Sequence, residues 1–186
     1  MGDWFETVVD PLVDAADAPA VADRVVAELI AAGLLKPVRT DCAVAGLGYP
    51  PAPGVLDYLK APDAQLMQLQ ANGLEVTVRR SVHVNVDVKR IVCPGCGAAT
   101  EDLSGLAWQD AVGEWYEGGQ GAISCPVCLQ QTSVAAWVHE PTCGFGNLAF
   151  TFWNWPPFEA AYWTKTPLQV IEAVVGHPCV MVWGKL

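Results

Sequence analysis

Positive charge is scarce in this sequence. Its 186 residues contain 10 Lys and Arg against 20 Asp and Glu, which gives a formal net charge of −10. No Lys or Arg occurs in residues 91–164, whereas acidic residues are spread through that stretch. Affinity for a nucleic acid backbone comes from Lys and Arg side chains that displace counterions. The shortage therefore argues against a nucleic acid as the partner.

Long apolar runs are also missing. A helix needs about 20 consecutive apolar residues to cross a bilayer, and the uncharged run 141–158 is interrupted by Pro, Gly and Asn. Residues 1–6 are acidic at the point where a secretory signal would be basic. We therefore expect no membrane segment and a cytoplasmic location.

Sequence motifs of catalysis are lacking as well. The chain has three histidines, His83, His139 and His177, and neither a G-x-S-x-G frame nor a phosphate-binding G-x-x-x-x-G-K-[ST] loop. His177-Pro178-Cys179 places a Cys two residues after a His, but it follows a helix end and opens an apolar strand, which favours a buried structural thiol over a nucleophile. An enzyme whose site is assembled from distant residues remains an alternative, with a histidine and the nearby arginines as its components.

Hydrophobic residues make up 52% of the chain and charged residues 16%, which excludes a disordered protein. Helical spacing and capping signals predict about three helices. The first begins after Asp17 and ends at Gly33, the second lies between residues 106 and 117, and the third begins at the capping box of Thr166 and Gln169.

Strands are predicted where the apolar period changes to two. These segments are residues 74–79, 82–92, 148–155 and 179–183. The helix at Thr166 then either makes a crossover within one sheet or packs across an antiparallel sheet. The chain is therefore predicted to be a single α+β domain over residues 1–186, with a mixed or antiparallel sheet.

Two identical C-P-x-C frames are the strongest motif. They are Cys93-Pro94-Gly95-Cys96 and Cys125-Pro126-Val127-Cys128, each at the end of a predicted strand. Two residues between cysteines allow both thiolates to reach one centre, and two such turns complete a tetrahedral Cys₄ shell. Seven cysteines in a chain of this size, without a secretory signal, favour metal over disulfides. We predict one structural zinc, with iron in the same shell and thiol redox chemistry as the two minor alternatives.

This pair of frames resembles the zinc ribbon, in which C-P-x-C-G knuckles lie on hairpins. The first frame matches through Gly97, and the second has Leu129 in place of the glycine. The resemblance covers residues 90–138 and implies an elaborated ribbon, because residues 97–124 separate the pairs and include a predicted helix. The chain as a whole also resembles a group of uncharacterised bacterial zinc-ribbon proteins, and this resemblance implies no activity. The segments that carry it, besides the knuckles, are residues 4–5, 72–76, 152–157 and 184–186.

Two further groups of side chains are candidate binding residues. The aromatic run 150–158 contains Phe152, Trp153, Trp155 and Phe158, which either belong to the protein's own core or form a surface for a partner. The basic quartet is Arg79, Arg80, Lys89 and Arg90, which either pairs with neighbouring acids or contacts an anion.

A closed metal site without a catalytic set favours a non-catalytic, zinc-stabilised interaction protein. Its acidic surface suits a basic or apolar partner, which is another protein or a second copy of this chain. The alternatives are an enzyme with a site near the basic quartet and a histidine, and a zinc ribbon that binds nucleic acid.

We expect no measurable binding of mixed-sequence DNA or RNA at physiological salt, because residues 91–164 supply no cation to displace counterions. A fluorescence polarisation titration with labelled oligonucleotides checks this. Micromolar affinity that weakens steeply with added salt would contradict the expectation and would make the basic quartet the contact surface.

Overall fold

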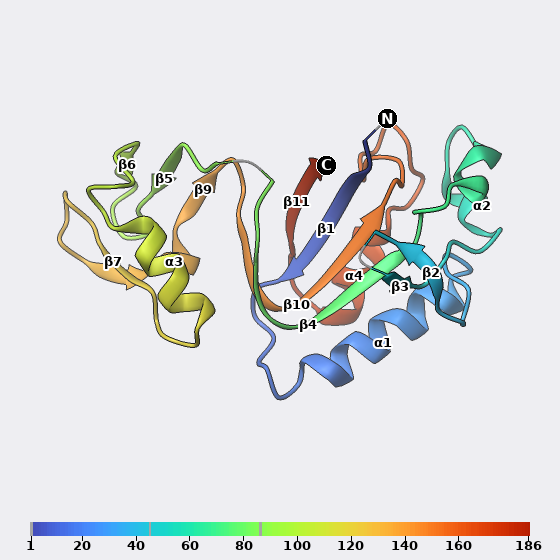
Figure 1. Ribbon diagram of the computed structural model, residues 1–186, viewed down its shortest axis with the longest axis horizontal. Helices are drawn as coiled ribbons and strands as arrows, with labels where there is room; N and C mark the ends of the chain where they lie inside the picture. The colour runs from blue at the N-terminus through green and yellow to red at the C-terminus, as the bar shows by residue number, and fades with distance from the viewer. Residues whose placement is uncertain (1, 45, 86) are drawn as a thin grey trace.

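The computed structural model of the chain describes residues 2–44, 46–85 and 87–186. It confirms an α+β fold of helices and antiparallel sheets. Figure 1 shows two parts, a main sheet with helices α1 and α4, and a smaller part on the left that contains α3 and the short strands β5 to β9. The smaller part, residues 88–143, is called the cysteine module below.

The main sheet has the strand order β11–β1–β10–β4, and all neighbouring strands are antiparallel. These strands are β1 (Trp4–Asp10), β4 (Leu74–His83), β10 (Gly144–Trp153) and β11 (Val180–Lys185). Because β10 and β11 both pair with β1, they run in the same direction, and α4 (Pro167–Val175) connects them across the sheet. With α1 (Ala18–Ala31) between β1 and β4, the connectivity is the β-α-β-β-α-β of ferredoxin-like folds.

Helices α1 and α4 cover one face of this sheet and form the larger hydrophobic core. Val8, Phe150 and Phe152 of the strands are fully buried there with Leu29 of α1 and Ile171 of α4. Three predicted helices, α1, α3 (Trp108–Tyr116) and α4, are confirmed, and the short α2 (Val55–Tyr58) was not predicted.

The capping signals act unequally at the helix ends. At α4 the predicted box forms, because the Thr166 hydroxyl accepts a hydrogen bond from the Gln169 N–H (3.2 Å) while the Gln169 side chain accepts one from the Thr166 N–H (2.9 Å). Asp17 precedes α1 but makes no capping hydrogen bond with its side chain. Gly33 follows α1 at a φ of +74°, the left-handed conformation that glycine adopts readily.

Residues outside these elements form short structures. Strands β2 (Thr40–Ala43) and β3 (Gly46–Gly48) pair with each other, and a 3₁₀ turn follows at Ala64–Gln68. In the cysteine module, β5 (Arg90–Val92) pairs with β6 (Ala99–Thr100) and β9 (Val138–Glu140), and β7 (Ala122–Ser124) pairs with β8 (Gln131–Ser133). A second 3₁₀ turn lies at Val134–Ala136.

The predicted continuous strand over residues 82–92 is wrong. Strand β4 ends at His83 and β5 begins at Arg90; residues 84, 85 and 87–89 lie outside strands, and residue 86 lies outside the described part of the chain. The chain leaves the main sheet here and enters the cysteine module, where Val88 is buried in a second hydrophobic cluster. Alternation of Val with polar residues does not reveal where a strand changes partners.

Strand β10 bends over the face of the main sheet that the helices leave open. Two glycines permit the close approach: a Cβ on Gly144 would lie 2.6 Å from the Val9 side chain, and one on Gly146 would clash with the backbone oxygen of Asp10. The register with β4 shifts between Gly146 and Leu148, as at a β-bulge. The bent β4–β10 pair therefore makes this face concave.

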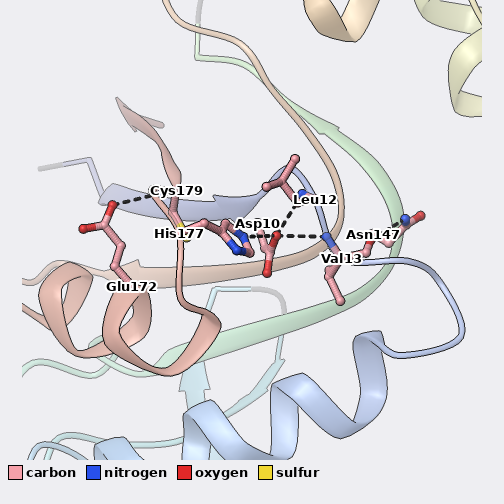
Figure 2. A network of polar contacts seen from close by, with 7 residues as sticks. All are labelled: Asp10, Leu12, Val13, Asn147, Glu172, His177 and Cys179. Carbon is pink, nitrogen blue, oxygen red and sulfur yellow. Dashed lines mark hydrogen bonds and ion pairs between the residues drawn. The ribbon is translucent and has the colours of Figure 1, made fainter.

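A polar network, shown in Figure 2, holds the end of β1 against the connection from α4 to β11. Asp10 is 1% exposed, and its Oδ1 accepts hydrogen bonds from the N–H groups of Leu12 (2.9 Å) and Val13 (3.0 Å). His177 Nε2 lies 2.8 Å from the same oxygen. The network also includes Asn147, Glu172 and Cys179.

Arg80 joins the main sheet to the cysteine module. Its guanidinium carbon lies 4.0 Å from the centre of the Trp115 ring of α3, and its Nη2 donates a hydrogen bond to the backbone oxygen of Gly119 (2.8 Å). A cation over an indole face is attracted by the ring quadrupole. This contact fixes α3 against β4.

We expect Arg80→Gln to lower the free energy of unfolding by about 2 kcal/mol, because it removes a partly desolvated cation–π contact and a hydrogen bond. Arg79→Gln is the matched control, since it makes the same charge change at an exposed neighbour and is expected to cost less than about 0.5 kcal/mol. Urea denaturation measures both. Equal losses in the two variants would contradict the role of Arg80.

Candidate functional site

The first C-P-x-C turn lies between β5 and β6. The Cys93 N–H donates to the backbone oxygen of Ala98 (2.9 Å), and the Gly97 N–H donates to the backbone oxygen of Cys93 (3.0 Å). Gly97 has a φ of +73°. These bonds fold the turn so that Cys93 and Cys96 face the same side.

The second turn, between β7 and β8, repeats this pattern. The Cys125 N–H donates to the backbone oxygen of Gln130 (3.0 Å), and the Leu129 N–H donates to the backbone oxygen of Cys125 (2.9 Å). Leu129 has a φ of +60°, so it adopts the same left-handed conformation as Gly97 without being glycine. The departure from the ribbon pattern in the sequence is therefore accommodated by backbone strain and not by a different turn.

The four sulfur atoms lie together. Cys93 Sγ is 3.8 Å from Cys128 Sγ, Cys96 Sγ is 3.7 Å from Cys125 Sγ, and all four lie within 4.8 Å of one another. Disulfide sulfurs would be about 2.05 Å apart. Four sulfurs placed tetrahedrally around an ion at about 2.3 Å would be about 3.8 Å apart. The spacing fits a four-coordinate thiolate metal site.

The electrostatics of the cluster favour thiolate formation at one ligand. Hydrogen bonds from the backbone N–H groups of Cys128 and Val127 lower the pKa of Cys125 to about 6, although burial acts in the opposite direction. The thiolate is the form that binds metal. Cys93 and Cys125 are buried while Cys96 and Cys128 are exposed, so the ligands lie at the surface of the module.

His139 does not join the metal cluster. It is 6% exposed and lies between aromatic rings, with ring-centre distances of 6.1 Å to Trp108 and 5.2 Å to Phe145. Burial lowers the pKa of His139 to about 4, so the ring is neutral at pH 7. Its surroundings are those of a core side chain.

A groove of about 370 Å³ lies on the concave, open face of the main sheet. Glu75, Thr77, Arg79, Ser81 and His83, which alternate along β4, line it together with Val82. Thr7 and Thr151 line it from β1 and β10, and their hydroxyl oxygens are 2.9 Å apart. Phe5 and Trp153 also line it, as does Tyr116 of α3, so the cysteine module forms part of the wall.

The groove brings together groups that are common in binding sites. Ser81 Oγ lies 3.0 Å from His83 Nε2. Burial lowers the pKa of His83, and the nearby positive charge of Arg79 lowers it further, so His83 is neutral at pH 7. Glu75 Oε2 accepts a hydrogen bond from the Trp153 indole N–H (3.1 Å).

The basic quartet is not brought together. Arg79 lines the groove, whereas Arg80 lies on the Trp115 ring. Lys89 Nζ lies 3.8 Å from the Asp87 carboxylate and Arg90 Nη1 lies 3.4 Å from the Glu140 carboxylate. Both pairs are solvent-exposed, which makes them weak.

The aromatic run is part of the protein's own core. Phe152 and Trp155 are fully buried and Trp153 is 8% exposed, while Phe158 is half-buried against the Phe152 ring at 4.9 Å. Trp155 stacks on Trp163 at 6.0 Å with an interplanar angle of 12°. Phe152, Trp155 and Phe158 are therefore not displayed as a surface for a partner, whereas Trp153 lines the groove.

Two features escaped the sequence analysis. Burial, together with the nearby charge of Glu159, raises the pKa of Glu6 to about 7 against the lowering effect of a backbone hydrogen bond at Phe158; no sequence pattern indicates this. The second feature is the groove, whose lining residues come from β1, β4, β10 and α3. The sequence indicated only the β4 part of it, through the alternation of polar residues that ends at His83.

Comparison of the chain with protein-family models, curated proteins and solved structures gave no match. The likeness to zinc ribbons thus depends on the two knuckles alone. In the described part of the chain, no helix is long and apolar enough to cross a membrane.

We expect Leu129→Gly to raise the unfolding free energy of the metal-loaded protein by about 0.5 kcal/mol, because relief of left-handed strain exceeds the added chain entropy. Leu129 is 79% exposed, so little packing is lost. Gly97→Ala is the reciprocal variant; a Cβ there meets nothing within 4 Å, and we expect a loss of about 1 kcal/mol. Denaturant unfolding measures both, and shifts of the same sign would contradict the equivalence of the knuckles.

Proposed function

We propose that the four cysteines hold one structural zinc and that the chain is a non-catalytic interaction protein. The observation that carries this proposal is the closed set of four sulfurs, which leaves no coordination position for a water or substrate. Cys42, Cys143 and Cys179 are unpaired as well, which suits a reducing compartment such as the cytoplasm.

The surface that best suits a protein partner is the edge strand β11. Trp183 on this strand is 69% exposed, and Trp4 of the neighbouring strand is 46% exposed. An edge strand has free backbone N–H and C=O groups that can pair with an added strand. Exposed Trp side chains contribute strongly to binding energy at interfaces.

The charge of the chain indicates the partner's chemistry. A net charge of −10 favours a partner segment that is basic or apolar, and it opposes close association with an acidic surface. Glu6 lies opposite Trp183 in the register of β1 and β11, which places a carboxyl group beside the exposed indole. Another protein is therefore proposed, with self-association through β11 as the other outcome.

Metal analysis of the purified protein is expected to give about one zinc per chain, because tetrahedral thiolate sites prefer zinc. Cys128→Ser is expected to reduce the content strongly, whereas Cys179→Ser, away from the cluster, leaves it unchanged. Iron in place of zinc, with a visible charge-transfer absorption, would contradict the metal identity. Absence of metal in protein whose Cys93, Cys96, Cys125 and Cys128 are all free thiols would contradict the site itself.

We expect a protein that crosslinks to β11 of the wild-type chain to lose this crosslink in the Trp183→Ala variant. The variant should lose little stability, because the Trp183 side chain is mostly exposed. Leu12→Ala is the control, since Leu12 is 67% exposed and lies outside β11. Crosslinking mass spectrometry on native lysate identifies the contact. Retention of the same partner and the same crosslinks by Trp183→Ala would contradict the proposed surface.

A second candidate function is an enzyme, and one observation favours it. The groove places the Ser81 hydroxyl within hydrogen-bond distance of a neutral His83 and brings Arg79 to the same site. A neutral histidine can accept the serine proton, and an arginine can stabilise developing negative charge. Ester hydrolysis that is lost in Ser81→Ala and His83→Gln would favour this function over the first.

A further inference from the structure

The groove contains a cation without a partner. Among the described residues, Arg79 has neither an ion pair nor a side-chain hydrogen bond, whereas Arg80, Lys89 and Arg90 are each engaged. The positive charge of Arg79 also lowers the pKa of His83, which shows that this charge acts on groups inside the groove. A free guanidinium in a concave site, in a chain of net charge −10, is suited to an anionic group of a ligand.

The other end of the groove is aromatic. The rings of Phe5 and Trp153 lie edge to face at 5.5 Å. Glu75 is fixed beside them by the Trp153 indole N–H, and its negative charge disfavours an anion at this end. The two ends therefore select opposite parts of a ligand, an anion at Arg79 and a neutral planar ring at Trp153.

The floor between the ends is polar. Thr7 and Thr151 line it with hydroxyl groups that share one hydrogen bond, so each keeps part of its bonding capacity, and Thr77 lines it with a third hydroxyl. Arg79 follows Glu75 by four positions along β4, which corresponds to about 13 Å at about 3.3 Å per residue. A volume of about 370 Å³ lies within the range of small-molecule sites.

We propose that this groove binds a small amphipathic anion, with its carboxylate or phosphate on Arg79, its planar ring against Trp153 and Phe5, and a polar linker over the threonine floor. The inference concerns binding alone. It depends on neither of the proposed functions, because β11 lies outside the groove and no chemical step is required.

Two pairs of probes test the proposal on the full-length, metal-loaded protein. N-benzoylglycine carries a ring, an amide and a carboxylate, and N-benzoylglycinamide is its neutral counterpart. Adenosine 5′-monophosphate carries a ring, a sugar and a phosphate, and adenosine is its neutral counterpart. Amide and indole NMR shifts report both affinity and location.

We expect at least one anionic probe to bind with a dissociation constant below about 1 mM and to shift the signals of residues 75–83 and the Trp153 indole. Its neutral counterpart should bind at least about tenfold more weakly, because a charged hydrogen bond is lost. The anionic probe that binds more tightly identifies the head group.

Arg79→Gln should weaken the anionic probe about tenfold or more and leave the neutral one unchanged. Arg24→Gln on the exposed face of α1 is the control and should change neither. The proposal is overturned if neither anion binds, if the shifts map outside the groove, or if Arg79→Gln and Arg24→Gln have equal effects. Because Arg79 is exposed, the variant is expected to fold, and its NMR spectrum verifies this.

Discussion

The convergence of four sulfurs on one centre is the constraint on which the cysteine module depends. Its hydrophobic cluster is small and separate from the core under α1 and α4. Small cores of this kind need a metal or disulfides to remain folded. Because residues 97–124 connect the two knuckles, the convergence of the four cysteines also restricts the position of α3.

The position of α3 in turn shapes the main sheet's open face. The Arg80 side chain packs on the ring of Trp115, and the adjacent Tyr116 lines one side of the groove. The bent β4–β10 pair forms the other side, and Gly144 and Gly146 permit this bend. The four-cysteine cluster is thus connected to the groove through packing and contributes no side chain to it.

Local signals predicted local structure well. The cysteine spacing predicted the ligand cluster, and the box at Thr166 predicted the start of α4. Properties that depend on partners distant in sequence escaped prediction. Arg79 and Arg80 are adjacent, yet one lines a groove and the other meets a ring of α3, because successive residues of a strand point to opposite faces and the partner on each face comes from a distant segment. The sequence of the aromatic run likewise did not indicate which other segments of the chain bury Phe152 and Trp155.

Hydrogen–deuterium exchange on metal-loaded and chelator-treated protein is the most direct test of the dependence of the cysteine module on its four sulfurs. Metal removal is expected to abolish amide protection in residues 88–143 and to weaken it near Arg80, while β1, α1 and α4 remain protected. Unchanged protection in the cysteine module, or equal loss of protection in both parts, would contradict this expectation.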